Sequence, residues 1–517
     1  MQLVNSVPIS SSTQIADPVD SFDVRKTEGF ARMPLDKLQV GDLKQPPPIL
    51  RFSSDFTARR PSIEERFAAG QKLRKAVPRR AHAEYRPSND RPDPVDILQA
   101  QDASRLKQLV PIKYARMLAS PFAFLRGSAA IMAHDLSTTP ATGLEVVACG
   151  DTHVSNFGVF GSAERKLIFA INDFDEVYPA PWEWDLKRLV ASAAVVAQFM
   201  GGDDDDAETA ARAAARSYRK RMRDYAFMGF LEVWYDQIDD QQVLDAGPPD
   251  YRKMALPLLA KARGKGNIHA LDKLTRRDGD EYRFVEHPPL IVREAALPDG
   301  TPTIVALDAR LRDYMRSLLD DRRGLLSRYR IVDFVRKVVG VGSAGTSCWA
   351  LLLQGLDSDD PLFLQVKQAG PSVLASFVRT RLPFRNQGRR VVVGQRVTQG
   401  SPDIFLGWGG DRRGDFYVRQ LVDMKGGAEF DQNTPGALDQ LNAYCGLCGW
   451  ALALAHAKSG DPAAIAGYCG KSEALDDALG KYALAYMRQN ERDYRALQKA
   501  KASGRVKVAK AGPETND

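Results

Sequence analysis

The sequence predicts an α+β fold, in which helices and antiparallel strands occupy different stretches of the chain. Apolar residues recur with helical periodicity over most of residues 61–330. Short apolar runs separated by glycine turns fill residues 331–425, and helical periodicity returns over residues 426–500. Runs of strands that follow runs of helices are typical of α+β proteins. We therefore predict a small antiparallel β lobe between two helical segments.

Composition limits the class of protein. The chain has 517 residues, of which 44% are hydrophobic and 26% charged, as in an ordinary soluble globular protein. The 72 Lys and Arg residues outnumber 65 Asp and Glu residues, a weak bias toward phosphate-bearing ligands. Because no nucleic-acid motif accompanies this charge, the sequence does not favour nucleic acid as a partner. The sequence indicates no oligomeric state.

The sequence also predicts where the protein works. No window approaches the roughly 18 uninterrupted apolar residues that a membrane span needs. The amino terminus lacks the basic start and apolar stretch of a signal peptide, and five cysteines are few for this length. We expect a cytoplasmic protein without a membrane partner.

The two ends of the chain are predicted to lie outside the core. Residues 1–60 contain Pro46-Pro-Pro48 and show no sustained periodicity, so we expect an extended or partly disordered extension whose purpose the sequence does not indicate. Helical periodicity begins at Ser62. Residues 501–517 are expected to form a basic, flexible tail.

Periodicity and turn residues predict the elements between these ends in order. Helices are expected from Val95 to Met117, from Trp182 to Val196 and over most of the stretch from Ala207 to about Tyr329. A further helix is expected from Leu441 to His456, where Cys445 and Cys448 would be buried side chains instead of a redox pair or half a zinc site. Strands are predicted over residues 144–149, 166–171, 333–339, 346–353, 361–367, 390–397 and 415–421.

Two acidic motifs stand close together in the sequence, on either side of the predicted strand 166–171. Asp151 and Asn156 lie in the polar loop Gly-Asp-Thr-His-Val-Ser-Asn, and Asp173 follows the strand. Phosphoryl transfer needs an oriented hydroxyl and metal ions on the phosphates. Asp151 is suited to orient or deprotonate the hydroxyl, while Asn156 and Asp173 supply oxygen ligands for Mg²⁺. The alternative is a purely structural Asx turn.

Neighbouring polar residues extend this candidate site. Asp175 and Glu176 could bind a second metal ion or face solvent, and His153 is placed to hold the loop backbone or to act beside Asp151. Arg126 stands in an apolar segment, where a charge is usually paired. It could hold an acidic catalytic-loop residue, a phosphate or a structural partner. Asp185, near the start of a helix, is expected to accept backbone N–H bonds and brace the loop.

A glycine-rich turn between two predicted strands is the second candidate site. Strands on both sides argue against a dinucleotide-binding turn, and the missing Gly-Lys-Ser/Thr argues against a Walker loop. The layout predicts phosphate binding by the turn and by a lysine on a following strand. A tight hairpin without a ligand is the alternative. The residues expected to bind the nucleotide are Gly340, Gly342, Ser343, Gly345, Thr346 and Lys367.

Together these residues resemble the protein-kinase-like superfamily, especially its aminoglycoside-phosphotransferase branch, whose catalytic loop reads Gly-Asp-x-His-x-x-Asn. The resemblance implies a two-lobed fold with a helical catalytic lobe and a small β lobe, and it implies ATP and Mg²⁺ as cofactors. In ordinary kinases the glycine loop and lysine precede the catalytic loop, whereas Lys367 follows Asp173 here. A circular permutation explains this order, with residues 417–425 as the hinge that leads to the helix from Leu441.

The chain between about Glu64 and Met487 also resembles a bacterial family catalogued as domain of unknown function twenty-two fifty-two. The motifs that carry this resemblance are Ser120-Pro-Phe-Ala-Phe-Leu-Arg-Gly127, Cys149-Gly-Asp-Thr-His-Val-Ser-Asn-Phe-Gly158, Asn172-Asp-Phe-Asp-Glu176, Trp182-Glu-Trp-Asp-Leu-Lys-Arg-Leu189, Val339-Gly-Val-Gly-Ser-Ala-Gly-Thr346 and Phe363-Leu-Gln-Val-Lys367. The family name leaves the reaction open.

One departure from the kinase pattern concerns the partner of the lysine. A kinase lysine is held by a glutamate from the next helix, but no acidic residue lies between Lys367 and Pro402. We expect Lys367 to be held by Asp173, by Asp403 or by nucleotide phosphate. The arginines of this stretch could bind an anionic substrate or form a solvated face.

These observations predict an ATP- and Mg²⁺-dependent phosphotransferase that acts on an unidentified small-molecule or protein hydroxyl. Two alternatives remain open at the level of sequence. The first is nucleotidyl (AMP) transfer on the same fold, and the second is a non-catalytic, pseudokinase-like nucleotide sensor. Asp151, Asn156 and Asp173 together count against the second.

Overall fold

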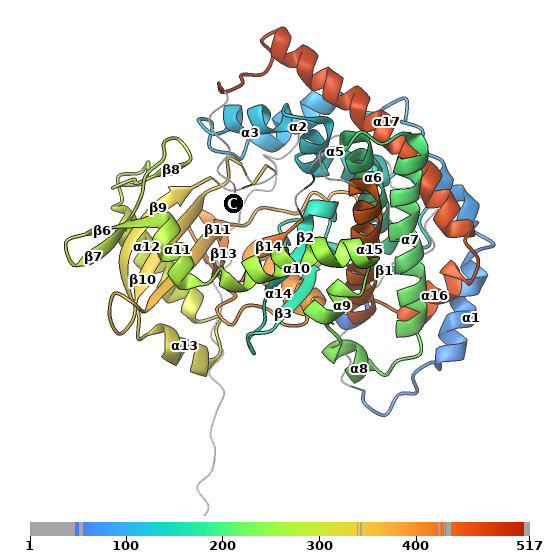
Figure 1. Ribbon diagram of the computed structural model, residues 1–517, viewed down its shortest axis with the longest axis horizontal. Helices are drawn as coiled ribbons and strands as arrows, with labels where there is room; N and C mark the ends of the chain where they lie inside the picture. Colours follow the sequence, from blue (N-terminus) through green and yellow to red (C-terminus); the bar gives the residue numbers. More distant parts are fainter. Residues whose placement is uncertain are drawn as a thin grey trace, which may run out of the picture. The chain divides into compact units, whose positions relative to one another are not determined.

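Helices and antiparallel sheets make up the structure, so the predicted α+β class is confirmed (Figure 1). The computed structural model describes residues 47–50, 55–338, 340–341, 344–421, 424–428, 430 and 436–510. Most of the predicted extension of residues 1–60 therefore lies outside the described residues. No described helix has both the length and the apolar composition needed to cross a membrane.

Three long helices form the centre of the helical part. α7 (Asp204–Tyr225) lies alongside α6 (Trp182–Phe199) and α15 (Ala437–Ser459), as Figure 1 shows. Small residues allow the close approach, because a buried alanine stripe of α7 faces α15. Gly449 of α15 sits against the backbone of Ala214, where a Cβ atom would lie 2.2 Å from the carbonyl oxygen. The predicted buried helix around Cys445 and Cys448 is confirmed, and both thiols are free.

Shorter helices cover this centre. α1 (Ile63–Leu73) packs on α16 (Pro462–Cys469), and α17 (Ala474–Ala502) packs on α6 and α7. Beyond α17, Val506 is buried and the Ala509 N–H donates to the Pro111 carbonyl, so residues 503–510 lie against the protein. The remaining helices of this part are α2 (Pro94–Asp102), α3 (Val110–Met117), α4 (Pro121–Arg126), α5 (Ala129–Leu136), α8 (Phe230–Tyr235), α9 (Asp240–Leu244) and α10 (Pro249–Gly264).

A six-stranded antiparallel sheet forms the strand-rich part, in the order β12-β13-β11-β10-β9-β8. Both faces are covered, which explains why β10 and β11 read as continuous apolar runs. Leu351 and Leu364 face α12, whereas Leu352 and Phe363 face α11. The strands are β8 (Ile291–Val292), β9 (Arg330–Lys337), β10 (Cys348–Gln354), β11 (Pro361–Gln368), β12 (Gly407–Asp411) and β13 (Gly414–Gln420).

The helices that cover this sheet include α11 (Asn267–Leu274), α12 (Thr303–Met315) and α13 (Asp320–Leu326). These helices and β8 precede residue 331, where the sequence predicts the β lobe to begin. The hairpin of β6 (Thr275–Asp278) and β7 (Glu281–Phe284) lies beside β9. The predicted division of the chain into lobes stays a prediction.

The predicted strand over residues 390–397 is wrong, because these residues form part of helix α14 (Gln387–Gln399). The three consecutive valines favour a strand locally. The helix is bracketed by Asn386, whose side chain accepts the Arg389 N–H, and by Gly400 in a left-handed conformation. Gly388 and Gly394 let α14 approach β13 and Val177 closely. Capping and tertiary packing therefore override the strand preference.

A second sheet positions the acidic motifs. Its order is β14-β2-β3-β5, with β2 (Phe157–Gly161) and β3 (Leu167–Ile171) as an antiparallel hairpin. β14 (Gly426–Gly427) and β5 (Ile238–Asp239) pair with its two sides. A separate pair of β1 (Glu145–Ala148) and β4 (Tyr178–Pro181) flanks the same segment of chain.

Candidate functional site

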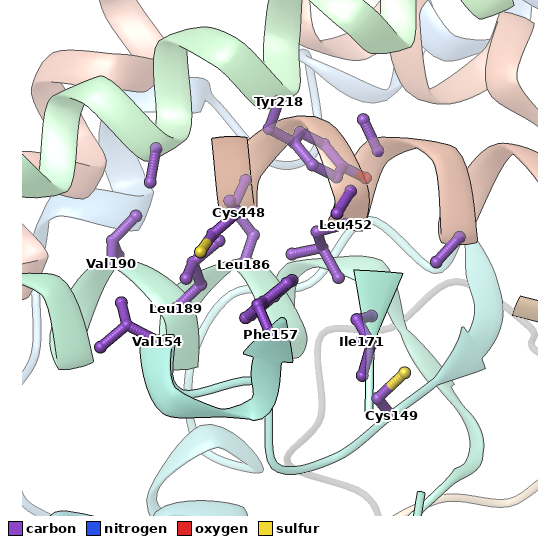
Figure 2. Close-up of a cluster of buried hydrophobic side chains, with 14 of the residues drawn as sticks. Cys149, Val154, Phe157, Ile171, Leu186, Leu189, Val190, Tyr218, Cys448 and Leu452 are labelled. Carbon is purple, nitrogen blue, oxygen red and sulfur yellow. The ribbon is translucent and has the colours of Figure 1, made fainter. Parts of the chain in front are cut away.

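The β2–β3 hairpin brings the two acidic loops together. Phe157 pairs with Ile171, so the residues just before β2 and just after β3 leave the hairpin at the same end. The Asn172 N–H donates to the Asn156 carbonyl at 3.0 Å, which fixes the junction of the loops. Figure 2 shows Val154, Phe157 and Ile171 directed toward the core formed with α6 and α15. The loops therefore rest on a packed apolar base.

Asp185 braces the loop that contains Asp151, as the sequence predicts. Its two carboxylate oxygens accept the N–H groups of Cys149 at 2.7 Å and Gly150 at 2.9 Å. The Thr152 hydroxyl donates to the Asp185 carbonyl, and His456 Nε2 lies 3.2 Å from the carboxylate. Gly150 has φ of +78°, a conformation that favours glycine. This network sets the direction in which the loop leaves β1.

Asp151 is held by Arg188 of α6, which sequence reasoning missed. Arg188 Nε donates to Asp151 Oδ1 at 2.7 Å, and the Arg188 side chain is only 1% exposed. Burial raises the pKa of the Asp151 carboxyl to about 6, against the opposing effect of Arg188. The positive charge of Arg126 acts in the same direction as that of Arg188. A charged residue inside the apolar sequence of α6 was the signal that could have identified Arg188.

His153 lies under the loop. Its side chain is 4% exposed, and Nε2 is 3.9 Å from Asp151 Oδ2, beyond hydrogen-bonding distance. Burial and the charges of Arg126 and Arg188 lower the pKa of His153 well below its usual value. The His153 carbonyl accepts the Asn156 N–H, and Asn156 Nδ2 donates to the Asp151 carbonyl at 2.7 Å. These contacts favour a role for His153 in holding the loop.

Lys367 extends from β11 of the six-stranded sheet to the acidic segment of residues 172–176, which follows β3. Its ammonium forms an ion pair with Asp175, and the Tyr417 hydroxyl donates to the same carboxylate at 2.7 Å. Burial alone would raise the pKa of Asp175, but Lys367 and Tyr417 lower it to about 2. The prediction that Asp403 holds Lys367 is therefore wrong, because Asp403 instead accepts the Phe405 and Gln420 N–H groups. The charge of Asp173 also raises the pKa of Lys367, but the ion pair forms with Asp175.

Two further arginines support this region from the sheet and from α14. Arg419 Nη1 lies 3.4 Å from the Asn172 carbonyl, and its Nε donates to Gln365. Arg390 is buried and donates to the carbonyls of Val177 and Gly370 at 2.7 Å. Arg390 thus belongs neither to a solvated face nor to a free anion-binding surface.

Glu176 also serves the local structure. Its Oε2 atom accepts the Val373 N–H at 2.7 Å, and its carbonyl accepts the Ser372 hydroxyl. Burial raises the pKa of the Glu176 carboxyl to about 7. The residue joins the acidic segment to the chain that follows β11.

The glycine turn lies between β9 and β10, as predicted. Gly340 and Gly345 have φ of +58° and +99°, which other residues seldom adopt. Arg116 donates to the Gly340 carbonyl, and Arg105 donates to the Ala344 carbonyl. Cys348, soon after the turn, pairs with Lys367 across β10 and β11, so the lysine lies beside the end of the turn. Thr346 is half-buried, and Gly342 and Ser343 lie outside the described residues.

Two of the predicted metal ligands, Asn156 and Asp173, lie at the same end of the β2–β3 hairpin. Within the described ranges, no three His, Cys, Asp or Glu side chains gather as a metal-binding cluster. Mg²⁺ keeps several waters and needs only one or two protein ligands beside substrate phosphates. Asn156 uses its amide N–H as a donor, which leaves the amide oxygen for a ligand. Asp173 follows at the same hairpin end, whereas Lys367 already neutralises Asp175.

Comparison with known proteins relates the chain to one family. A family model described as "Uncharacterized protein conserved in bacteria (DUF2252)" matches residues 105–500. The match includes Asp151, Asp173, Arg188 and Lys367. No significant match was found among the curated proteins or the solved structures.

Proposed function

The chain belongs to the DUF2252 family of bacterial proteins, and we propose that it is an ATP- and Mg²⁺-dependent phosphotransferase of kinase-like type. The observation that carries the proposal is the ion pair between Lys367 and Asp175. It joins the strand beside the glycine turn to the loop that contains Asp173, although these segments lie far apart in the sequence. Around a nucleotide, the phosphate-binding lysine and the metal-binding carboxylate must lie close together. The ion pair with Asp175 places Lys367 beside the loop that carries Asp173, the proposed metal ligand.

The arrangement of strands also supports a kinase-like, circularly permuted, two-lobed fold. In protein kinases the glycine-rich loop precedes a lysine on the third strand. Here the glycine turn joins β9 to β10, and Lys367 lies on the next strand, β11. Helix α14 follows but carries no carboxylate, so Asp175 takes the place of the usual glutamate. β14 then returns the chain to β2 beside the catalytic loop.

Each side chain has a separate role in the proposed reaction. Asp151, with a pKa of about 6, is mostly ionised at neutral pH and accepts the proton of the attacking hydroxyl. Arg188 holds the Asp151 carboxylate in position. Asn156 and Asp173 would hold Mg²⁺, which neutralises charge on the phosphates when bound. Lys367 and the turn around Gly345 would hold the phosphate oxygens of the nucleotide.

Replacement of Asp173 tests the proposal. The Asp173→Asn variant should lose Mg²⁺-dependent ATP turnover by roughly 10²–10³-fold, because the amide lacks the charge that binds the metal ion. Turnover is measured with the purified chain and a panel of small hydroxyl compounds. Asp224→Asn, at an exposed carboxylate of α7, is the matched control. Turnover by Asp173→Asn at the native rate would refute the assignment.

Nucleotidyl transfer is the second candidate, because the lysine partner departs from the kinase pattern. Lys367 pairs with Asp175 and not with a helix glutamate, a difference that could accompany a reversed nucleotide. Mass spectrometry of the product separates the two reactions. A phosphoryl increment supports the phosphotransferase, whereas an adenylyl increment supports nucleotidyl transfer.

A further inference from the structure

A basic pocket lies where α1, α7 and the end of α16 meet, and none of its lining residues belongs to the site around Asp151. The cavity has a volume of about 330 Å³. Four cationic side chains line it, from Arg74, Arg79, Arg223 and Lys471. The polar Gln71 and Ser472 and the rings of Phe67 and Phe227 complete its walls.

Two guanidinium groups meet over Gly470 in this pocket. Arg74 donates to the carbonyls of Gly467 and Tyr468, and Arg79 donates to the carbonyl of Cys469 at 2.9 Å. Gly470 has φ of +74°, and a Cβ atom there would lie 2.7 Å from Arg74 Nη2 and 2.8 Å from Arg79 Nη1. The glycine thus lets two like charges approach each other closely.

No carboxylate in the described part of the chain forms an ion pair with any of the four cations. The acidic residues that follow Ser472 have other partners, because Glu473 pairs with Arg212 and Arg216. Likewise, Asp476 pairs with Arg219. Like charges held together without a counter-ion raise the free energy of the site, and a bound anion would remove that cost.

Donors remain for such an anion. Within the described residues, Arg74 Nη1 and Arg79 Nη2 form no hydrogen bond, and neither does the ammonium of Lys471. Capping of the α16 carbonyls explains why Arg74 and Arg79 are present. It does not explain Lys471 or Arg223, which bond none of those carbonyls, although the Arg223 guanidinium lies over the Phe227 ring at 5.9 Å from its centroid. The second pair of cations points to a ligand.

We propose that this pocket binds the phosphate group of a phosphorylated small molecule or lipid. Arginine forks match phosphate oxygens, and the four cations exceed the charge of one phosphate dianion. The rings of Phe67 and Phe227, with centroids 6.2 Å apart, offer an apolar wall for the rest of the ligand. On α8, Phe230 and Leu231 are 75% and 68% exposed, and the Phe230 ring lies 5.5 Å from the Arg66 guanidinium of α1, which leaves a lipid as one source of the phosphate. This proposal is independent of the proposed function.

Binding to the full chain tests the proposal. Calorimetric titration with phenyl phosphate, at constant ionic strength in chloride, should give Kd below about 1 mM. The Arg223→Gln/Lys471→Gln variant should bind at least about 10-fold more weakly, because two charge-assisted contacts are lost while the caps of α16 remain. Lys220→Gln/Lys481→Gln, at two exposed lysines, is the matched control and should bind like the native chain.

Vesicles separate the two sources of phosphate. The native chain and the control variant should co-sediment with phosphatidylcholine vesicles that contain phosphatidic acid if the ligand is a lipid headgroup. The pocket variant, Arg223→Gln/Lys471→Gln, should then stay in the supernatant. Phenyl phosphate binding without co-sedimentation identifies a soluble ligand. The proposal is overturned if neither probe binds, or if the pocket variant binds them as the native chain does. If the double variant fails to fold, Lys471→Gln alone, at an exposed position, gives the same comparison.

Discussion

At the residue scale, Asp151 shows how one environment combines opposing effects on a carboxyl group. Burial disfavours its charge, while Arg188 favours it, and the resulting pKa is about 6. A carboxylate with a pKa slightly below neutral is ionised at neutral pH yet still accepts a proton. Arg188 and Asp185, both on α6, therefore fix the position of the loop and the chemistry of its acid.

The raised pKa predicts how stability depends on pH. The folded chain binds the Asp151 proton more tightly than the unfolded chain, so the resulting stability is present at low pH and is lost as pH rises through about 6. Asp151→Asn lacks this titration. From pH 5 to pH 8, the unfolding free energy of Asp151→Asn should therefore rise relative to the native chain by on the order of 1 kcal/mol.

Urea unfolding at both pH values measures this difference. Asp224→Asn corrects for the loss of one negative charge at an exposed site. If the unfolding free energies of Asp151→Asn and the native chain differ by the same amount at pH 5 and at pH 8, the pKa of Asp151 is not raised.

At the element scale, small residues decide how closely helices pack. The sequence around Cys445 and Cys448 predicts a buried helix with close neighbours, and α15 confirms it. Sequence also predicts strand 361–367 correctly, yet it predicts a strand over 390–397 where α14 forms. Valines favour strands locally, whereas the Asn386 cap and the contact of Gly388 with β13 act through the fold.

Two glycines of α15 test the packing argument. Gly449→Ala should lower the unfolding free energy by roughly 1–3 kcal/mol, because its Cβ atom would lie 2.2 Å from the Ala214 carbonyl oxygen. Gly446→Ala should raise it by about 0.4–1 kcal/mol, since no neighbouring atom lies within 4 Å and alanine favours a helix. Chemical denaturation of both variants gives the comparison. Equal effects would contradict the close contact of α7 and α15.

At the scale of the whole molecule, contacts between distant segments complete the candidate site. Lys367 reaches Asp175 across 192 residues, and β14 pairs with β2 after the chain has left the six-stranded sheet. Arg105 and Arg116, which precede the loop that contains Asp151, hold the glycine turn. The site therefore depends on the sheet and the helical part being joined.

A double-mutant cycle measures this connection. Lys367→Met and Asp175→Asn should each lower the unfolding free energy by about 3–5 kcal/mol, because each leaves a buried group without its partner. The loss of unfolding free energy in the double variant should be smaller than the sum of the losses in the two single variants. The difference is the coupling energy between the two side chains, roughly 0.5–3 kcal/mol. Additive losses, measured by denaturant unfolding, would mean that the two side chains do not interact in solution.

The sequence by itself determined the α+β class, the long helices α6 and α15, strands such as β3 and β11, the loop that contains Asp151 and Asn156, and the bracing role of Asp185. These features follow from periodicity, capping and turn chemistry, which act over a few residues. Only the tertiary structure decided that Arg188 holds Asp151, that Asp175 holds Lys367, and that Arg74 and Arg79 meet in a basic pocket. Such pairings join segments far apart in the chain. Sequence patterns act over a few residues, so they do not specify which of many distant carboxylates meets which cation.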